Sequence, residues 1–88
     1  MLKVGVLVSG GGTNLQAILD AIDAGRVKNA KVSFVFSNNA NAYALERAKN
    51  AGIEAMALSP SSFETREEFN QAMLRALKER NLDLIVLA

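Results

Sequence analysis

Four short aliphatic runs, separated by segments with helical periodicity, constrain the fold of this chain more than any other feature. The runs cover residues 2–8, 31–36, 53–58 and 82–87, and each is bounded by Gly, Ser, Asn or Asp. Runs of this length and composition predict buried strands. Strands that alternate with helices predict a parallel sheet with right-handed crossovers. We therefore expect a single α/β unit with no internal domain boundary.

Apolar stripes mark the three expected helices. The first stripe falls at i, i+3, i+4 and i+7, on Leu15, Ile18, Leu19 and Ile22, and Gly25 is placed to end that helix. A weaker, alanine-rich helix covers about residues 42–50, with Leu45 and Ala48 on its inner face and Gly52 beyond its end. The third helix repeats the stripe at Phe69, Ala72, Met73, Ala76 and Leu77, with acidic residues at its start and basic ones near its end.

Composition narrows the classes of molecule that the chain could bind. The net charge of the 88-residue chain is +1 and both signs are mixed along it, so the sequence carries no electrostatic footprint for nucleic acid or for an anionic membrane. The chain has no cysteine, which excludes disulfides and thiolate metal sites within it. Its apolar runs are too short to cross a bilayer. We expect a cytoplasmic protein, and the apolar ending "LDLIVLA" predicts the first half of a larger domain.

A glycine-rich turn after the first strand is the strongest candidate binding site. In a parallel sheet all strand-to-helix turns lie at one edge, which brings residues 9–14, 37–41 and 59–65 together. Gly10, Gly11 and Gly12 allow a ligand to approach bare backbone, and Thr13 and Gln16 have the spacing of a capping box. Backbone N–H groups at a helix start favour a phosphate. The alternative is a tight turn followed by a simple cap.

The details of this turn favour a compact phosphate monoester. A P-loop needs a lysine directly after its glycines, whereas this turn continues with Thr13 and Asn14. A dinucleotide site fits poorly as well, because its third glycine position is Leu15 and the second strand ends without an acidic residue. Asn14 is equally suited to contact the ligand or to serve as the N-cap of the helix.

A resemblance to a known family becomes specific at these residues. The stretches "VLVSGGGTNLQAILDAI", "VFSNNANAYALERAKNAGI", "SSFETREEFN" and "LDLIVLA" resemble the N-terminal half of the phosphoribosylglycinamide formyltransferases, folate-dependent enzymes of purine biosynthesis. The resemblance implies a Rossmann-like three-layer α/β/α fold with strand order 3-2-1-4. It also implies that Gly11, Gly12, Thr13 and Asn14 hold the phosphate of glycinamide ribonucleotide, the acceptor of a formyl group from 10-formyltetrahydrofolate.

Two further residues acquire roles from the resemblance. Arg66 corresponds to an arginine on the folate side of the family's site, and a cation in the first turn of a helix has a small cost that an anionic partner would offset. The alternative is an exposed arginine paired with Glu64 or a neighbouring acid. Leu87 is similar to a residue that lines the folate pocket, and its alternative is packing within a buried strand.

The catalytic residues of the family have no counterpart in this sequence. The resemblance places an Asn, a His and an Asp beyond residue 88, and the chain contains no histidine. We therefore expect a substrate-binding half that is inactive alone and that self-associates through the edge of its fourth strand. Two alternatives stay open, namely a phosphate- or nucleotide-binding module of another Rossmann-like enzyme, and a non-catalytic half-domain that assembles with a partner chain.

Overall fold

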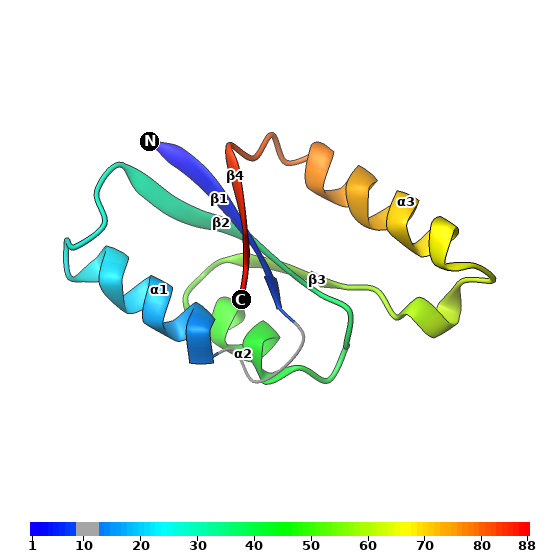
Figure 1. The fold of residues 1–88 in the computed structure, drawn as a ribbon. Helices are drawn as coiled ribbons and strands as arrows, with labels where there is room; N and C mark the ends of the chain where they lie inside the picture. Colours follow the sequence, from blue (N-terminus) through cyan, green and yellow to red (C-terminus); the bar gives the residue numbers. More distant parts are fainter. Residues whose placement is uncertain (9–12) are drawn as a thin grey trace.

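The computed structural model describes residues 1–8 and 13–88. Its elements follow in the order β1 (Leu2–Val8), α1 (Thr13–Asp23), β2 (Ala30–Ser37), α2 (Tyr43–Asn50), β3 (Glu54–Ala57), the 3-10 turn η1 (Pro60–Ser62), α3 (Arg66–Lys78) and β4 (Leu84–Leu87) (Figure 1). The strands form one parallel sheet in the order β3-β2-β1-β4, which confirms the expected topology. No helix in the described part of the chain is long and apolar enough to cross a membrane.

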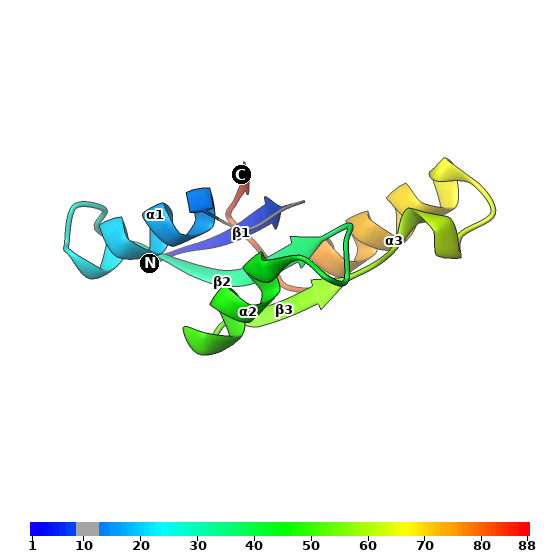
Figure 2. The same ribbon diagram turned by 90° about the horizontal axis from the view of Figure 1, so that it is seen from below.

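The sheet is the middle of three layers. Helices α1 and α2 lie on one side of it and α3 lies on the other (Figures 1 and 2). The first interface is aliphatic, with Val4, Val6 and Val8 of β1 packed against Leu15 and its stripe on α1. The second interface is aromatic, and it joins Phe34 and Phe36 of β2 to Phe69 and Leu77 of α3. The structure is therefore the Rossmann-like α/β/α fold expected from the sequence.

An extra residue in β2 determines which of its side chains face each of the two interfaces. The pairing of β1 with β2 advances from Val4 opposite Val32 to Gly5 opposite Phe34, which leaves Ser33 as a β-bulge. Val32 and Val35 consequently face α1 and α2, whereas Phe34 and Phe36 face α3. Strict alternation would have placed Val32 on the side of the two phenylalanines. The bulge thus gives α3 an aromatic surface at the end of β2 where the candidate site lies.

Glycines end the first two helices as the sequence predicts. Gly25 and Gly52 have φ angles of 77° and 74°. The residue after each glycine donates to a carbonyl five positions earlier, Arg26 to Ala21 at 2.9 Å and Ile53 to Ala48 at 2.9 Å. This bond defines the Schellman motif, in which a left-handed residue closes the helix. The expected inner face of α2 was partly wrong, because Ala44 and Ala48 are its buried residues and Leu45 is only half-buried.

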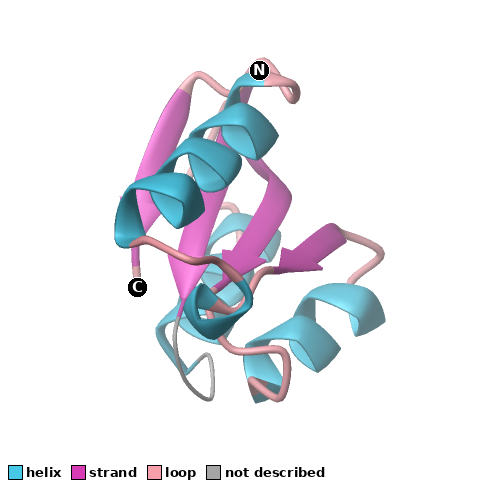
Figure 3. Cartoon of the chain, turned by 90° about the vertical axis from the view of Figure 1, so that its right-hand side faces the viewer, coloured by secondary structure: helices cyan, strands magenta, loops and turns pink. Residues whose placement is uncertain are grey.

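Strand β4 forms an exposed edge of the sheet. It pairs with β1 along one side, and its side chains at Leu84, Ile85 and Leu87 are 51%, 44% and 79% exposed. Val86 is half-buried because it faces the core beneath α1. Figure 3 shows the C-terminus at the lower end of this outer strand, whereas the N-terminus lies at the opposite, upper end of the molecule. Three of the four apolar side chains from residue 84 to 87 are therefore exposed.

Arg80 fastens the C-terminal end of α3 to the sheet. Its guanidinium carbon lies 4.2 Å from the centre of the Phe34 ring. Its Nη1 donates to the carbonyl of Ala76 at 2.7 Å, and its Nη2 lies 2.8 Å from a carboxylate oxygen of Glu54 on β3. The side chain of Arg80 is 18% exposed, whereas that of Glu54 is 56% exposed, so the contact with Phe34 is shielded and the ion pair is open to solvent. Arg80 therefore links α3, β2 and β3 at the end of α3 farthest from Arg66.

We expect Arg80→Ala to lower the free energy of unfolding by about 1–3 kcal/mol, because it removes a shielded cation–π contact and the hydrogen bond to the Ala76 carbonyl. Arg75→Ala, at an exposed position of the same helix, is the matched control and should change stability by less than about 0.5 kcal/mol. Urea unfolding followed by circular dichroism measures both. Equal effects of the two substitutions would show that Arg80 does not fasten α3.

Candidate functional site

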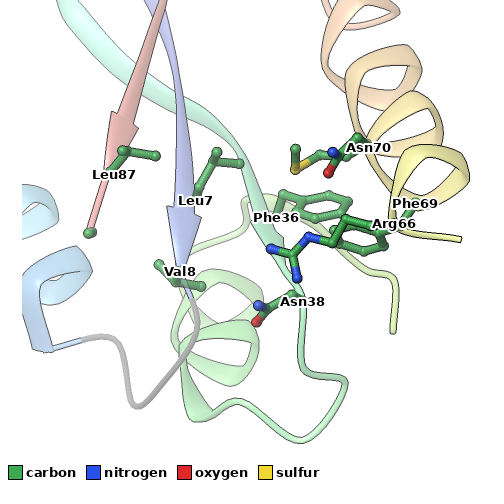
Figure 4. Close-up of a pocket in the computed structure, with 10 residues that line it drawn as sticks. Leu7, Val8, Phe36, Asn38, Arg66, Phe69, Asn70 and Leu87 are labelled. Carbon is green, nitrogen blue, oxygen red and sulfur yellow. The ribbon is translucent and has the colours of Figure 1, made fainter. Parts of the chain in front are cut away.

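A pocket lies where the strands end, between the sheet and α3. Its volume is about 320 Å³. Figure 4 shows its lining, which comes from the ends of β1, β2 and β4 and from the first two turns of α3. The lining consists of Leu7, Val8, Phe36, Asn38, Arg66, Phe69, Asn70, Met73, Leu87 and Ala88. This is the edge at which open α/β sheets bind their ligands, as the sequence predicts.

The turn after β2 brings Asn38 to the pocket. Ser37 is fully buried, and its hydroxyl both donates to the Asn39 carbonyl and accepts from the Asn39 N–H, each at 3.0 Å. The Asn39 side chain in turn accepts from the N–H of Asn41 at 2.9 Å. These local bonds hold the turn without using the side chain of Asn38. Asn38 is consequently left exposed at the mouth of the pocket.

Arg66 begins α3 and reaches into the pocket. Thr65 caps the helix, because its hydroxyl accepts from the backbone N–H of Glu68 at 3.1 Å. The guanidinium extends from the helix toward β1 and Asn38 (Figure 4). Arg66 forms no ion pair with Glu64 or with any other residue that the structure describes. The interpretation of Arg66 as a surface ion pair is therefore wrong for this structure, and its charge is open to a ligand.

Leu87 lies across the pocket from Arg66. It was assigned either to a pocket wall or to the interior of a buried strand, and its side chain is 79% exposed on the edge strand β4. Packing within a buried strand is therefore not what the described residues show, because β4 pairs only with β1 among them and Leu87 is exposed. Two residues that the sequence places 21 positions apart, Arg66 and Leu87, line one cavity.

The glycine turn predicted to hold a phosphate falls largely outside the residues that the structure describes. Gly11 and Gly12 lie outside the described residues, and so does the side chain of Thr13. The turn leaves the sheet at Val8, which lines the pocket, and returns at the start of α1. Asn14 is exposed and is the second residue of α1, so its interpretation as the N-cap was wrong, while contact with a phosphate stays a prediction.

The capping box expected of Thr13 and Gln16 is not the arrangement found. Helix α1 already begins at Thr13, which makes it a helical residue rather than the cap. The side chain of Gln16 is engaged elsewhere, since it donates to Asp20 at 3.0 Å and accepts from Arg47 at 3.2 Å. Gln16 thus ties the first turn of α1 to α2, next to the glycine turn.

The described lining residues of the pocket have side chains suited to binding a ligand. Arg66 is the one charged residue among its described lining residues, and Phe36, Phe69, Met73 and Leu87 provide an apolar wall. Such a cavity suits a ligand with an apolar body and an anionic end. No described lining residue carries a carboxylate, imidazole or amine that could exchange a proton with a substrate.

Sequence reasoning missed two polar residues of the site. Neither Asn38 nor Asn70 was singled out, although Asn70 follows Arg66 by four residues and so shares its helix face. That spacing was the available signal for Asn70. The signal for Asn38 was its place within residues 37–41, which the sequence brings to this edge, and the turn held by Ser37 and Asn39 leaves its side chain exposed there.

Comparison with known proteins identifies many relatives of one kind. Phosphoribosylglycinamide formyltransferase of Escherichia coli K12 is 41% identical over 87 residues, which cover 99% of this chain and 41% of that protein. The enzyme of the same name from Haemophilus influenzae is 44% identical over 88 residues, which cover 100% of this chain and 41% of that protein. The chain thus spans about two fifths of the length of these relatives and matches their N-terminal part.

Solved structures give the same result for the fold. Phosphoribosylglycinamide formyltransferase of Coxiella burnetii superposes with a TM-score of 0.93 at 39% identity, over 99% of this chain and 40% of that one. Glycinamide ribonucleotide transformylase 1 of Symbiobacterium toebii superposes with a TM-score of 0.91 at 44% identity, over 100% of this chain and 41% of that one. The model of the formyl transferase family matches residues 2–88. With a pocket at the sheet edge and a family match along nearly its whole length, the chain belongs to the formyl transferase family.

Proposed function

We propose that this chain is the substrate-binding half of a phosphoribosylglycinamide formyltransferase. The reaction transfers the formyl group of 10-formyltetrahydrofolate to the amine of glycinamide ribonucleotide. One observation carries the proposal: Arg66 and Leu87, the two residues assigned to the folate side, line the same pocket at the carboxyl ends of the strands. The names of the relatives and structural neighbours support the same activity.

The proposed site has two neighbouring parts. Gly11, Gly12, Thr13 and Asn14 hold the phosphate of the ribonucleotide on backbone N–H groups at the start of α1. Arg66 binds a carboxylate of the folate, and Leu87 contacts its apolar body. Val8 supports this division, because it ends the strand that leads into the glycine turn and also lines the pocket. Both ligands would then meet at the end of β1.

The chemical step needs groups that this chain does not supply. When the amine attacks the formyl carbon, negative charge develops on the formyl oxygen and the amine must lose a proton. The chain contains no histidine, and its described pocket residues offer no other group for that proton. We place these groups in the remaining part of the protein, so this chain binds the two substrates and holds them in register.

We further propose that the protein works in the cytoplasm on small molecules alone. The mixed charges of the chain, with a net charge of +1, support the absence of a nucleic-acid or membrane partner, and its lack of cysteine suits a reducing compartment.

Gly12→Val in the full-length enzyme should weaken binding of glycinamide ribonucleotide by roughly tenfold or more, because a branched side chain obstructs the approach of the phosphate to the backbone. Binding of 10-formyltetrahydrofolate should change little. Isothermal titration calorimetry with each substrate measures the difference, and circular dichroism verifies that the variant is folded. Equal losses for both substrates would contradict a local role in phosphate binding.

Arg66→Ala should raise the dissociation constant for a polyglutamylated folate by about tenfold or more, since it removes a charge-assisted hydrogen bond, and should leave the ribonucleotide unaffected. Arg66→Lys should recover only part of the affinity, because lysine retains the charge but lacks the planar fork. Arg75→Ala, on the exposed part of α3, is the control. Unchanged folate binding by Arg66→Ala would remove Arg66 from the site.

The 88-residue chain produced alone should associate with itself at micromolar concentration and show no formyl transfer. Strand β4 presents unpaired backbone and exposed Leu84, Ile85 and Leu87, and such an edge pairs readily with another strand. Ile85→Lys should weaken the association, because a charge opposes edge pairing. Sedimentation equilibrium measures the mass. A monomer at all concentrations would disprove the role of this edge.

A further inference from the structure

Asn70 is a polar residue of the pocket that the fold itself does not use. It is half-buried on α3, and its side chain makes no hydrogen bond within the described residues. Its neighbour Gln71 differs, because Gln71 points away from the pocket and donates to Glu67 at 3.2 Å. In Figure 4 the amide of Asn70 points from α3 into the space shared with Leu7 and Leu87.

The position of Asn70 relative to Arg66 indicates which ligand groups the two side chains could bind together. The two residues are four positions apart on α3 and both line the pocket, so their Cβ atoms are about 5–6 Å apart on one face of the helix. A guanidinium is complementary to a carboxylate. A side-chain carboxamide offers one donor group and one acceptor, which is complementary to a secondary amide. The pair therefore matches a secondary amide that stands directly beside a carboxylate.

The remaining lining residues define what is attached to that amide. The rings of Phe36 and Phe69 and the side chain of Met73 border the space next to Asn70. Aromatic side chains and methionine sulfur favour an aromatic ligand group. An aromatic acyl group joined through an amide to an acidic amino acid satisfies all three features of the wall.

We propose that Asn70 is a specificity-determining residue of this pocket, whose side chain hydrogen-bonds the amide of an N-aroyl amino acid while Arg66 binds the adjacent carboxylate. The inference rests on the proposed function, because the tail of a folate is a group of this class. It adds a residue that reads the amide linkage and so distinguishes folates with an amino acid tail from folates without one.

The test compares two ligands in the full-length enzyme, tetrahydrofolate and tetrahydropteroate, which lacks the amide and the amino acid. Asn70→Ala should weaken binding of tetrahydrofolate by about three- to tenfold, the effect of one net hydrogen bond, and leave tetrahydropteroate unchanged. Gln71→Ala, one residue along the same helix and outside the pocket, is the matched control and should change neither affinity. Thermal unfolding verifies that each variant is folded.

Asn70→Asp provides a second variant of nearly the same size. The new carboxylate would pair with Arg66 one helical turn away and could not donate to the ligand carbonyl. Tetrahydrofolate should therefore bind more weakly to this variant than to Asn70→Ala, again without a change for tetrahydropteroate.

The outcomes separate this inference from the function on which it rests. If Asn70→Ala weakens both ligands equally, or weakens neither, Asn70 does not read the amide and the inference fails. If Arg66→Ala lowers the affinity for tetrahydrofolate while Asn70→Ala does not, the inference fails and the proposed function stands. If the unsubstituted enzyme binds neither ligand, the proposed function fails with it.

Discussion

The pairing of β1 with parallel strands on both sides is the constraint on which the rest of the structure depends. β1 pairs with β2 on one side and with β4 on the other, so it occupies the interior of the sheet. Because the strands are parallel, their carboxyl ends all lie at the same edge of the sheet, and each connection to the next strand runs back through a helix. The pocket and the start of α3 lie at that edge, because the strands of a parallel sheet all end there.

The position of α3 sets the geometry of the site. Phe69 packs against Phe36, with ring centres 6.5 Å apart, and against Phe63, with ring centres 5.8 Å apart. Arg80 holds the other end of the helix through Phe34 and Glu54. Because α3 is held at both ends, the side chains on its first two turns have a defined place relative to the sheet. The aromatic layer itself depends on the bulge at Ser33, which directs Phe34 and Phe36 toward α3.

The described pocket has groups suited to binding a ligand. The described pocket combines one unpaired cation with amides and an apolar wall, which is enough to orient a ligand. Acyl transfer additionally needs groups that stabilise an oxyanion and move a proton, and effective catalysis needs them held close to the bound substrates. The chain spans two fifths of the length of these relatives, and the pocket residues that the structure describes include no carboxylate, imidazole or amine side chain.

Much of the fold could be predicted from the sequence because its signals are local. The apolar runs and the stripe of Leu15, Ile18, Leu19 and Ile22 reflect the periods of strands and helices, and Gly25 and Gly52 end helices because glycine tolerates positive φ. The helix starts were less certain, since a cap depends on one or two hydrogen bonds. Thr13 and Asn14, each considered as the cap, are instead the first and second residues of α1.

The candidate site was only partly determined by the sequence. The resemblance identified Arg66 through the motif that contains it. Whether Arg66 pairs with Glu64 or stays available to a ligand depended on the direction of its side chain in the folded structure. Leu87, Asn38 and Asn70 reach the pocket from β4, the turn after β2 and α3, three segments brought together by sheet order and by aromatic packing. Local periodicity determined the elements, whereas only the tertiary structure decided which side chains meet, because convergence arises from contacts between residues distant in sequence.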